Sequence, residues 1–122
     1  MRKYTFKRWI PHLLAFNKTA INLKAWKFKY LFHDIDKPFL NLFRSNDYVK
    51  KYHRYNSKHH VEYKNLDKQD FEAMVIDWEC SVITKPDKPL NAVDTFNNYY
   101  VYKLNKDQIK GIEEALTKLK LI

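Results

Sequence analysis

The spacing of apolar residues is the feature that most constrains the fold of this chain. It follows the 3.6-residue repeat of a helix rather than the alternation of a strand. Steps of three and four residues predict one helix that ends near Asn22 and a second helix that follows it. We expect Pro38 to end the second helix, since proline disfavours the helical state at Lys37 and has no N–H to donate. The two apolar faces consist of Trp9, Leu13, Phe16 and Ala20 in the first helix, and of Ala25, Phe28, Leu31 and Phe32 in the second.

Capping residues indicate three further helices. Asp47 is placed to cap a third helix, and the pair Asp67 and Asp70 forms a capping box that opens a fourth. Asn105 caps a last amphipathic helix, which turns its lysines outward. The faces of these helices are marked by Val49, Tyr52 and Asn56 in the third, by Phe71, Met74, Val75 and Trp78 in the fourth, and by Ile109, Ile112, Leu116 and Leu119 in the last.

Two segments do not fit this helical pattern. Residues 96–104 are aromatic and β-branched, which leaves a short strand open as an alternative. Residues 85–91 contain two prolines and are the best candidate for a short linker. Because a chain of 122 residues and 14.9 kDa suits one core, we expect a single domain over residues 1–122. The predicted fold class is all-α, a bundle of five or six helices.

Composition narrows the functions that such a bundle can serve. Hydrophobic residues make up 45% of the chain and charged residues 30%, which excludes a disordered chain and a membrane protein. The single glycine excludes a phosphate-cradling loop and a dinucleotide-binding turn, since each needs several glycines. Twenty-three Lys and Arg against fourteen Asp and Glu give a net charge of +9, which suits phosphate-bearing partners.

The compartment is inferred from one cysteine and from the lack of long apolar runs. Cys80 stands alone, so we expect no intrachain disulfide and a reducing, cytoplasmic location. No window approaches the ~20 apolar residues that span a bilayer, so we expect no membrane partner. The oligomeric state is not predicted by the sequence.

Several polar residues stand where helices should be apolar. His12 lies in the middle of the first helix, His33 and Asp34 are adjacent at the end of the second, and Asp77 interrupts the apolar run 73–78. A buried carboxylate is costly unless it is paired or bound to a cation. If these groups meet in the core, their donors suit a divalent ion such as Zn²⁺, Mn²⁺, Fe²⁺ or Mg²⁺. The alternative is hydrogen-bonded core histidines and an aspartate paired with a lysine.

In this order, His12, the doublet His33-Asp34 and Asp77 resemble the motif of the HD-domain metal-dependent phosphohydrolases. The chain is most similar to small uncharacterised HD-like proteins of bacteria and phages, over HD-x-x-K at 33–37, H-R-x-N-x-x-H-H at 53–60 and D-W at 77–78. The resemblance implies an HD-like helical fold, one or two divalent ions and hydrolysis of a nucleotide or another small phosphate ester. Asp36 departs from the family, which usually has glycine at this position.

The segment 53–60 adds histidines to this set. If it is helical, His53, Asn56 and His60 share a face, and His59 points about 100° away. We prefer His60 with His53 for a second ion, and a solvated basic loop is the alternative. Lys37 lies one turn after Asp34, where it can bind phosphate, and the alternative is a surface charge beyond a helix C-terminus, which the helix dipole favours. The candidate metal ligands are therefore His12, His33, Asp34, His60 and Asp77, and the candidate catalytic residues are Asp34, Lys37, His53 and His59.

A second hypothesis is a non-catalytic nucleic-acid-binding module or an inactive HD-like protein. The segments KYTFKRW at 3–9 and KAWKFKY at 24–30 interleave basic and aromatic residues. Such basic residues can neutralise backbone phosphates while the aromatic rings stack on bases. Against this hypothesis, helical periodicity assigns many of those rings to the core. A metal-dependent nuclease would combine the two hypotheses.

Overall fold

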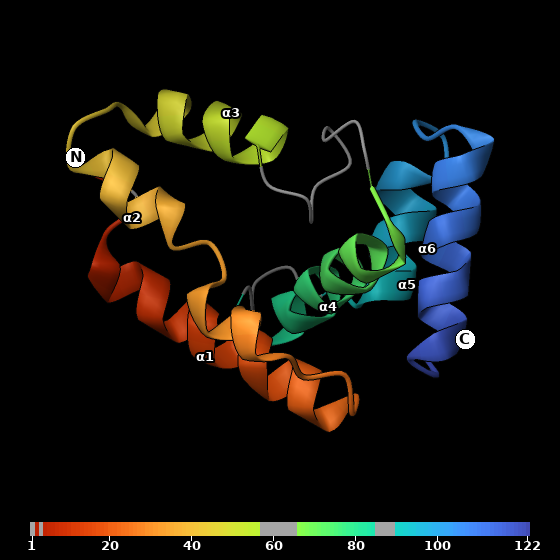
Figure 1. The fold of residues 1–122 in the computed structure, drawn as a ribbon. Coiled ribbons are helices and arrows are strands. Elements are labelled where there is room, and N and C mark those ends of the chain that lie inside the picture. The colour runs from red at the N-terminus through yellow and green to blue at the C-terminus, as the bar shows by residue number, and fades with distance from the viewer. Residues whose placement is uncertain (1, 3, 57–65, 85–89) are drawn as a thin grey trace.

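The computed structural model describes residues 2, 4–56, 66–84 and 90–122, and within these ranges the chain is helical and has no strand (Figure 1). This architecture confirms the predicted all-α class. None of the helices in these ranges combines the length and hydropathy needed to cross a membrane. The elements are α1 (Phe6–Asn22), the 3₁₀ helix η1 (Phe28–Phe32), α2 (Asp36–Asn41), α3 (Asn46–Asn56), α4 (Lys68–Thr84), α5 (Ala92–Thr95), the π-helical η2 (Phe96–Tyr100) and α6 (Lys106–Lys118).

Helix α4 forms the centre of the bundle. It contacts α1 on one side and α6 on another, so it is apolar around most of its circumference (Figure 1). Phe16 from α1 and Ile112 and Leu116 from α6 are fully or almost fully buried, as their helical spacing predicted. The buried apolar side chains of α4 itself are Phe71, Met74, Val75, Ile76, Trp78 and Cys80.

Two of the predicted helix caps are present and one is wrong. Asp67 and Asp70 exchange reciprocal backbone-to-carboxylate hydrogen bonds of 2.9 Å, and Asn105 caps α6 by the same kind of exchange with its third residue. Helix α3, however, begins one residue before Asp47. Its cap is Ser45, whose hydroxyl accepts a hydrogen bond from the Tyr48 N–H. Asp47 lies in the first turn, where the helix dipole favours a negative charge.

The predicted second helix is wrong in length, type and orientation. The chain turns at Lys24, whose φ is 57°, and then forms only the five-residue 3₁₀ helix η1. Residues three apart lie on one side of a 3₁₀ helix, so Tyr30 and His33 can both pack against Phe16 of α1. The predicted core residues Phe28, Leu31 and Phe32 consequently face outward and are 70%, 41% and 56% exposed.

The sequence predicted that Pro38 would end a helix, and this prediction is wrong. The proline lies in the first turn of α2, where the missing N–H interrupts no helical hydrogen bond. Lys37 is therefore helical as well. The linker predicted for residues 85–91 lies mostly outside the described residues, and its last residue, Asn91, caps α5 by accepting the Asp94 N–H at 2.8 Å.

The segment 96–104 contains a π-helical turn instead of a strand. Phe96 is buried in the core, and the ring of Tyr100 stacks on Trp78 of α4 with 4.7 Å between centroids. The aromatic residues that raised the β-propensity of this segment therefore pack as a helical layer. Tertiary contacts override a weak local preference here.

The only glycine of the sequence lies where α6 packs against the ring of Phe71 on α4. A methyl group added at Gly111 would overlap the ring of Phe71. We expect Gly111→Ala to lower the free energy of unfolding by about 1–3 kcal/mol, because overpacking outweighs the ~1 kcal/mol that alanine gains in helix propensity. Urea unfolding measures this difference. Lys110→Ala on the exposed side of α6 should leave stability nearly unchanged, and a stabilised Gly111→Ala variant would contradict the predicted overlap.

Candidate metal centre

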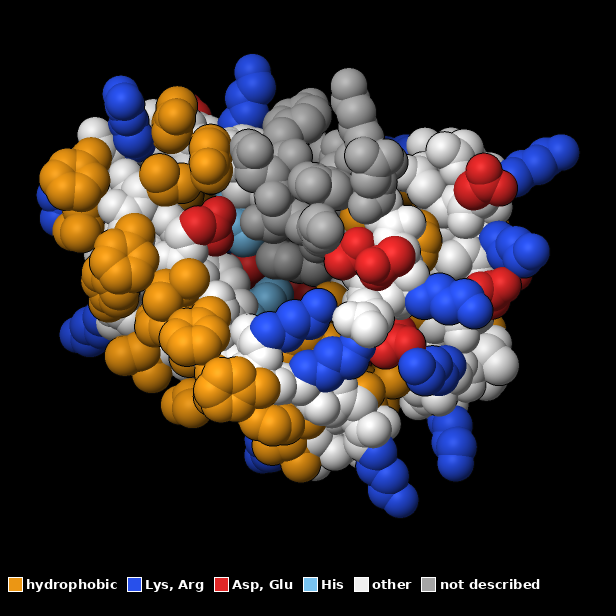
Figure 2. All heavy atoms as spheres, in the orientation of Figure 1, with side chains coloured by type: hydrophobic (Ala, Val, Ile, Leu, Met, Phe, Trp, Pro, Cys, Tyr) orange, Lys and Arg blue, Asp and Glu red, His pale blue; other side chains and the backbone are white. Residues whose placement is uncertain are grey.

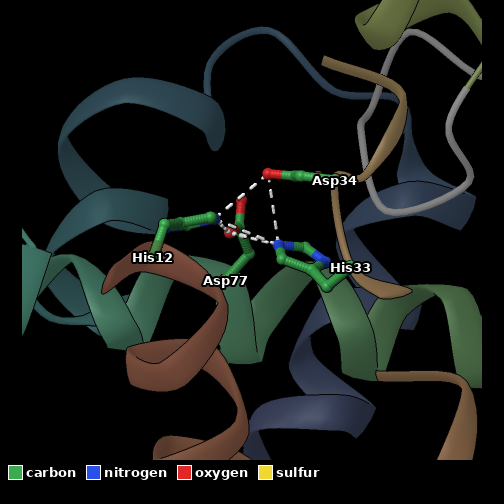
Figure 3. Close-up of side chains that lie close together, drawn as sticks. All are labelled: His12, His33, Asp34 and Asp77. Atoms are coloured by element: carbon green, nitrogen blue, oxygen red, sulfur yellow. Dashed lines mark hydrogen bonds and ion pairs between the residues drawn. The ribbon is translucent and has the colours of Figure 1, made fainter. Parts of the chain in front are cut away.

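Four side chains converge where α1, α4 and the segment between η1 and α2 meet (Figure 3). His12 comes from the middle of α1, His33 and Asp34 from the residues that follow η1, and Asp77 from α4. One ligand atom from each residue lies within 4.8 Å of the others. The structure thus brings together the ordered set His12, His33-Asp34, Asp77 on which the metal prediction depended.

The ligand atoms of these four side chains converge on one centre. The Nε2 atom of His12 lies 3.1 Å from Asp34 Oδ2, 3.3 Å from Asp77 Oδ1 and 3.1 Å from His33 Nε2. The Nε2 atom of His33 lies 3.3 Å from Asp34 Oδ2 and 3.2 Å from Asp77 Oδ1. Nitrogen and oxygen ligands bound at ~2.1 Å in a tetrahedral site lie roughly 3.4 Å apart. The spacing and the chemistry of the donors therefore fit a divalent ion such as Zn²⁺, Mn²⁺ or Fe²⁺.

Local packing holds the two residues of the HD doublet in place. The ring of His33 is stacked on Phe16 with 3.6 Å between centroids, and Trp9 Nε1 donates a 2.6 Å hydrogen bond to the His33 carbonyl. Asp34 has a φ of 57°, a left-handed conformation that aspartate tolerates better than most residues. This turn lets adjacent residues direct both side chains into the same site.

The electrostatics of the four groups favour positive charge at their centre. Burial alone would lower the pKa of His12, but its hydrogen bonds with Asp34 and Asp77 outweigh burial and raise the pKa to about 12. Burial opposes ionisation of Asp77, yet hydrogen bonds with His12 and His33 hold its pKa well below the usual value. Two carboxylates thus stabilise a cation between α1 and α4.

His53 connects Asp34 to a second carboxylate. Its Nε2 lies 2.8 Å from Asp34 Oδ1, and its Nδ1 lies 2.8 Å from both carboxylate oxygens of Asp36. The side chain is almost fully buried on α3, four residues after the buried Val49. The sequence predicted that His53 would help to bind a second ion. In the structure both of its ring nitrogens face carboxylates, so His53 orients Asp34 instead. His59 and His60 lie outside the described residues.

The role of Asp36 was missed by reasoning from the sequence. The sequence identified this residue only as a departure from the HD-domain motif that the chain resembles. In the structure it pairs with His53, so that one histidine bridges two acids. The signal that could have found this contact is the helical spacing of Val49 and His53, which places an imidazole on the buried face of α3.

Lys37 lies beside the four converging groups. Its Nζ is 3.3 Å from Asp34 Oδ2 and 5.4 Å from the centre of the Tyr4 ring. Burial would lower the pKa of Lys37, but the charges of Asp34 and Asp77 raise it, so the ammonium stays protonated. The structure therefore places this residue next to the predicted ligands, as its position three residues after Asp34 indicated.

A cavity of 740 Å³ opens above the site, with His12, Asp34 and Asp77 among its lining residues. Figure 2 shows a histidine at the base of a hollow with basic side chains beside it. Aromatic residues, including Trp78 and Tyr99, line other parts of the cavity. The basic lining residues are Arg8, Lys37, Lys50, Arg54 and Lys103.

Comparison of the chain with protein-family models, with curated proteins and with solved structures gave no match. The arrangement of the side chains is therefore the basis for any functional assignment.

Divalent ions should stabilise the protein through this site. We expect Mn²⁺ or Zn²⁺ to stabilise the native protein by about 2.7 kcal/mol when the free ion exceeds its Kd a hundredfold. Asp77→Asn removes a carboxylate ligand and should abolish the ion-induced rise in Tm, measured by thermal unfolding with and without the ion. Asp47→Asn changes an exposed side chain of α3, so it is the control and should keep the ion-induced rise in Tm. An equal rise in the Asp77 variant would contradict the assigned ligands.

The contact between Asp36 and His53 should affect ion binding indirectly. Partners that orient metal ligands typically change metal affinity by about 10- to 100-fold. We therefore expect Asp36→Asn to increase the ion concentration needed for half of the Tm shift by that factor, while the maximal shift remains. Asp47→Asn is a matched control, because Asp36 and Asp47 both lie in the first turn of a helix. Unchanged ion affinity in Asp36→Asn would exclude this supporting role.

Proposed function

We propose that this protein is a metal-dependent phosphohydrolase that acts on a nucleotide or another small phosphate ester. The observation that carries the proposal is the convergence of two imidazole nitrogens and two carboxylate oxygens, most of their contacts 3.1–3.3 Å, at the base of a cavity with basic walls. The order of these residues resembles the HD-domain motif, and that resemblance supports an HD-like domain with this activity.

His12, His33, Asp34 and Asp77 would hold the ion. A bound divalent ion supplies a water molecule whose pKa is lowered toward ~7, and it stabilises negative charge that develops on the phosphoryl group. The described residues provide ligands for one ion. A second ion would need donors such as His59 or His60, which lie outside the described residues.

The other side chains of the site would position the substrate. Lys37 is held beside Asp34 as a protonated ammonium, so it can donate to a phosphoryl oxygen or to the leaving oxygen. Arg8 and Arg54 on the cavity wall would neutralise further phosphate charge. His53 and Asp36 would keep the second oxygen of Asp34 fixed, so that the first stays directed toward the ion.

The buried free thiol of Cys80 fits a reducing compartment, and we propose that the reaction takes place in the cytoplasm. Cys80 itself donates to the Asp77 carbonyl at 3.1 Å, and burial raises the pKa of its thiol. These contacts assign Cys80 a structural role beside the site.

Lys37 and Asp34 should affect catalysis in different ways. With Mn²⁺ present, we expect hydrolysis of p-nitrophenyl phosphate or bis-p-nitrophenyl phosphate, read from release of nitrophenolate. Asp34→Asn should abolish both the activity and the ion-induced rise in Tm. Lys37→Met should keep the rise in Tm but lower kcat/KM by about 10²-fold or more, because it removes a charged donor to the phosphoryl group.

Two controls make this assay decisive. Lys110→Met removes a charge from the exposed side of α6 and should leave kcat/KM unchanged. Activity that survives in Asp34→Asn at the wild-type level would come from a contaminant and would remove the support for the proposed hydrolase.

A further inference from the structure

Five aromatic rings are exposed on one side of the molecule, and helical periodicity had assigned two of them, Phe28 and Phe32, to the core. Phe28 and Phe32 of η1 face outward, and so do Phe39 of α2 and Phe43 just after it, the last of which is 84% exposed. Trp26, just before η1, is also exposed. We call these five residues the aromatic face. Figure 2 shows hydrophobic side chains as a continuous band over the region in which Figure 1 draws α2 and the segment that follows α1.

The aromatic face is comparable in area with the largest apolar patch of a typical monomer. A fully exposed aromatic side chain offers about 150–250 Å², so these rings together expose roughly 500 Å². Leu31 and Leu42 are also exposed on the same elements and extend this area. The largest apolar patch of a typical monomer is about 300–600 Å² and is often functional. A partner is therefore expected for this side of the protein.

The excess positive charge lies in the same part of the chain. Residues 1–56 contain thirteen Lys and Arg against three Asp and Glu, whereas residues 57–122 contain ten against eleven. Two of the three acids, Asp34 and Asp36, face His53 in the metal centre. Of the described residues up to 56, only Asp47 then places a carboxylate outside that centre. Lys24 and Lys29 are exposed in the same segment as Trp26 and Phe28, so an anionic partner suits the aromatic face.

Two of the exposed rings have supports that fix their orientation. Trp26 Nε1 donates a 2.7 Å hydrogen bond to Asn17 Oδ1, which holds the indole while part of it stays exposed. Phe39 packs edge-on against Phe6 of α1 at 5.1 Å between centroids. Rings held in this way lose little conformational entropy when a flat group stacks on them.

We propose that the aromatic face binds single-stranded nucleic acid. The exposed basic residues Lys24 and Lys29 flank Trp26 and Phe28 along the chain, so phosphates of a single strand can contact the lysines while its bases stack on the rings. Stacking needs unpaired bases, because a duplex buries the faces of its bases. A second copy of this chain is disfavoured, since it would bring two sets of exposed lysines that include Lys24 and Lys29 together.

This inference goes beyond the proposed hydrolase and does not depend on it. The aromatic face contains none of the four residues that converge in the metal centre. If both proposals hold, the substrate is a strand whose phosphodiesters approach the basic cavity. If the hydrolase proposal fails, binding of the strand by the aromatic face remains.

Fluorescence anisotropy with labelled oligothymidylate tests the inference. We expect binding that weakens steeply between about 50 and 200 mM salt, with a labelled duplex of equal length bound more weakly. Phe28→Ala and Phe32→Ala should each raise Kd about tenfold or more, because each removes a stacking surface. Tyr102→Ala is the control, since Tyr102 is 86% exposed outside the aromatic face and should leave Kd unchanged.

A pair of charge reversals completes the test. Lys29→Glu should weaken binding and lower the slope of the salt dependence, whereas Lys110→Glu on α6 changes the net charge equally with a much smaller effect. The inference is overturned by an absence of binding at low salt or by equal affinity for the duplex. A mass that rises with protein concentration in light scattering, and does not rise in Phe28→Ala, would assign the face to self-association instead.

Discussion

The structure depends on how two carboxylates are held between helices that are otherwise apolar. Asp34 is almost fully buried, and Asp77 projects from the central helix α4. An unpaired carboxylate in this position would be strongly destabilising. Four basic side chains compensate the two charges, namely His12 of α1, His33 just after η1, Lys37 of α2 and His53 of α3. The same polar contacts that make the site therefore tie the N-terminal elements to α4.

Phe16 connects this polar centre to the apolar core. One face of its ring stacks on His33, and the ring also meets Tyr30 edge-on at 5.0 Å. Tyr30 and His33 are three residues apart, and the tight 3₁₀ turn of η1 lets both of them contact the same ring. The turn has two consequences, because it directs His33 toward α4 and turns Phe28 and Phe32 toward solvent. The geometry of the metal centre and the exposure of the aromatic face thus have the same cause.

Helical periodicity predicted the long helices of the bundle, where local pattern and packing agree. It also identified His12 and Asp77, because a polar residue inside an apolar helical run needs a partner. It was wrong between Ala25 and Pro38, where contacts with Phe16 replace an α-helix by a short 3₁₀ helix. Five residues cannot show a period clearly, so the sequence could not distinguish core from surface there. His53 was predicted as a candidate catalytic residue, but its link to Asp36 depends on the packing of α3 against α2, which no local pattern encodes.

Asp36 illustrates how a departure from a motif can be compensated within the same site. A carboxylate two residues after Asp34 would repel an anionic substrate if it faced the cavity. Here its charge is directed to His53 Nδ1, and the opposite nitrogen of the same ring binds Asp34 Oδ1. Burial lowers the pKa of His53, but its hydrogen bonds with the two carboxylates outweigh burial and raise the pKa above its usual value. Since His53 pairs with one acid and orients the other, the side chain at position 36 contributes to the order of the centre.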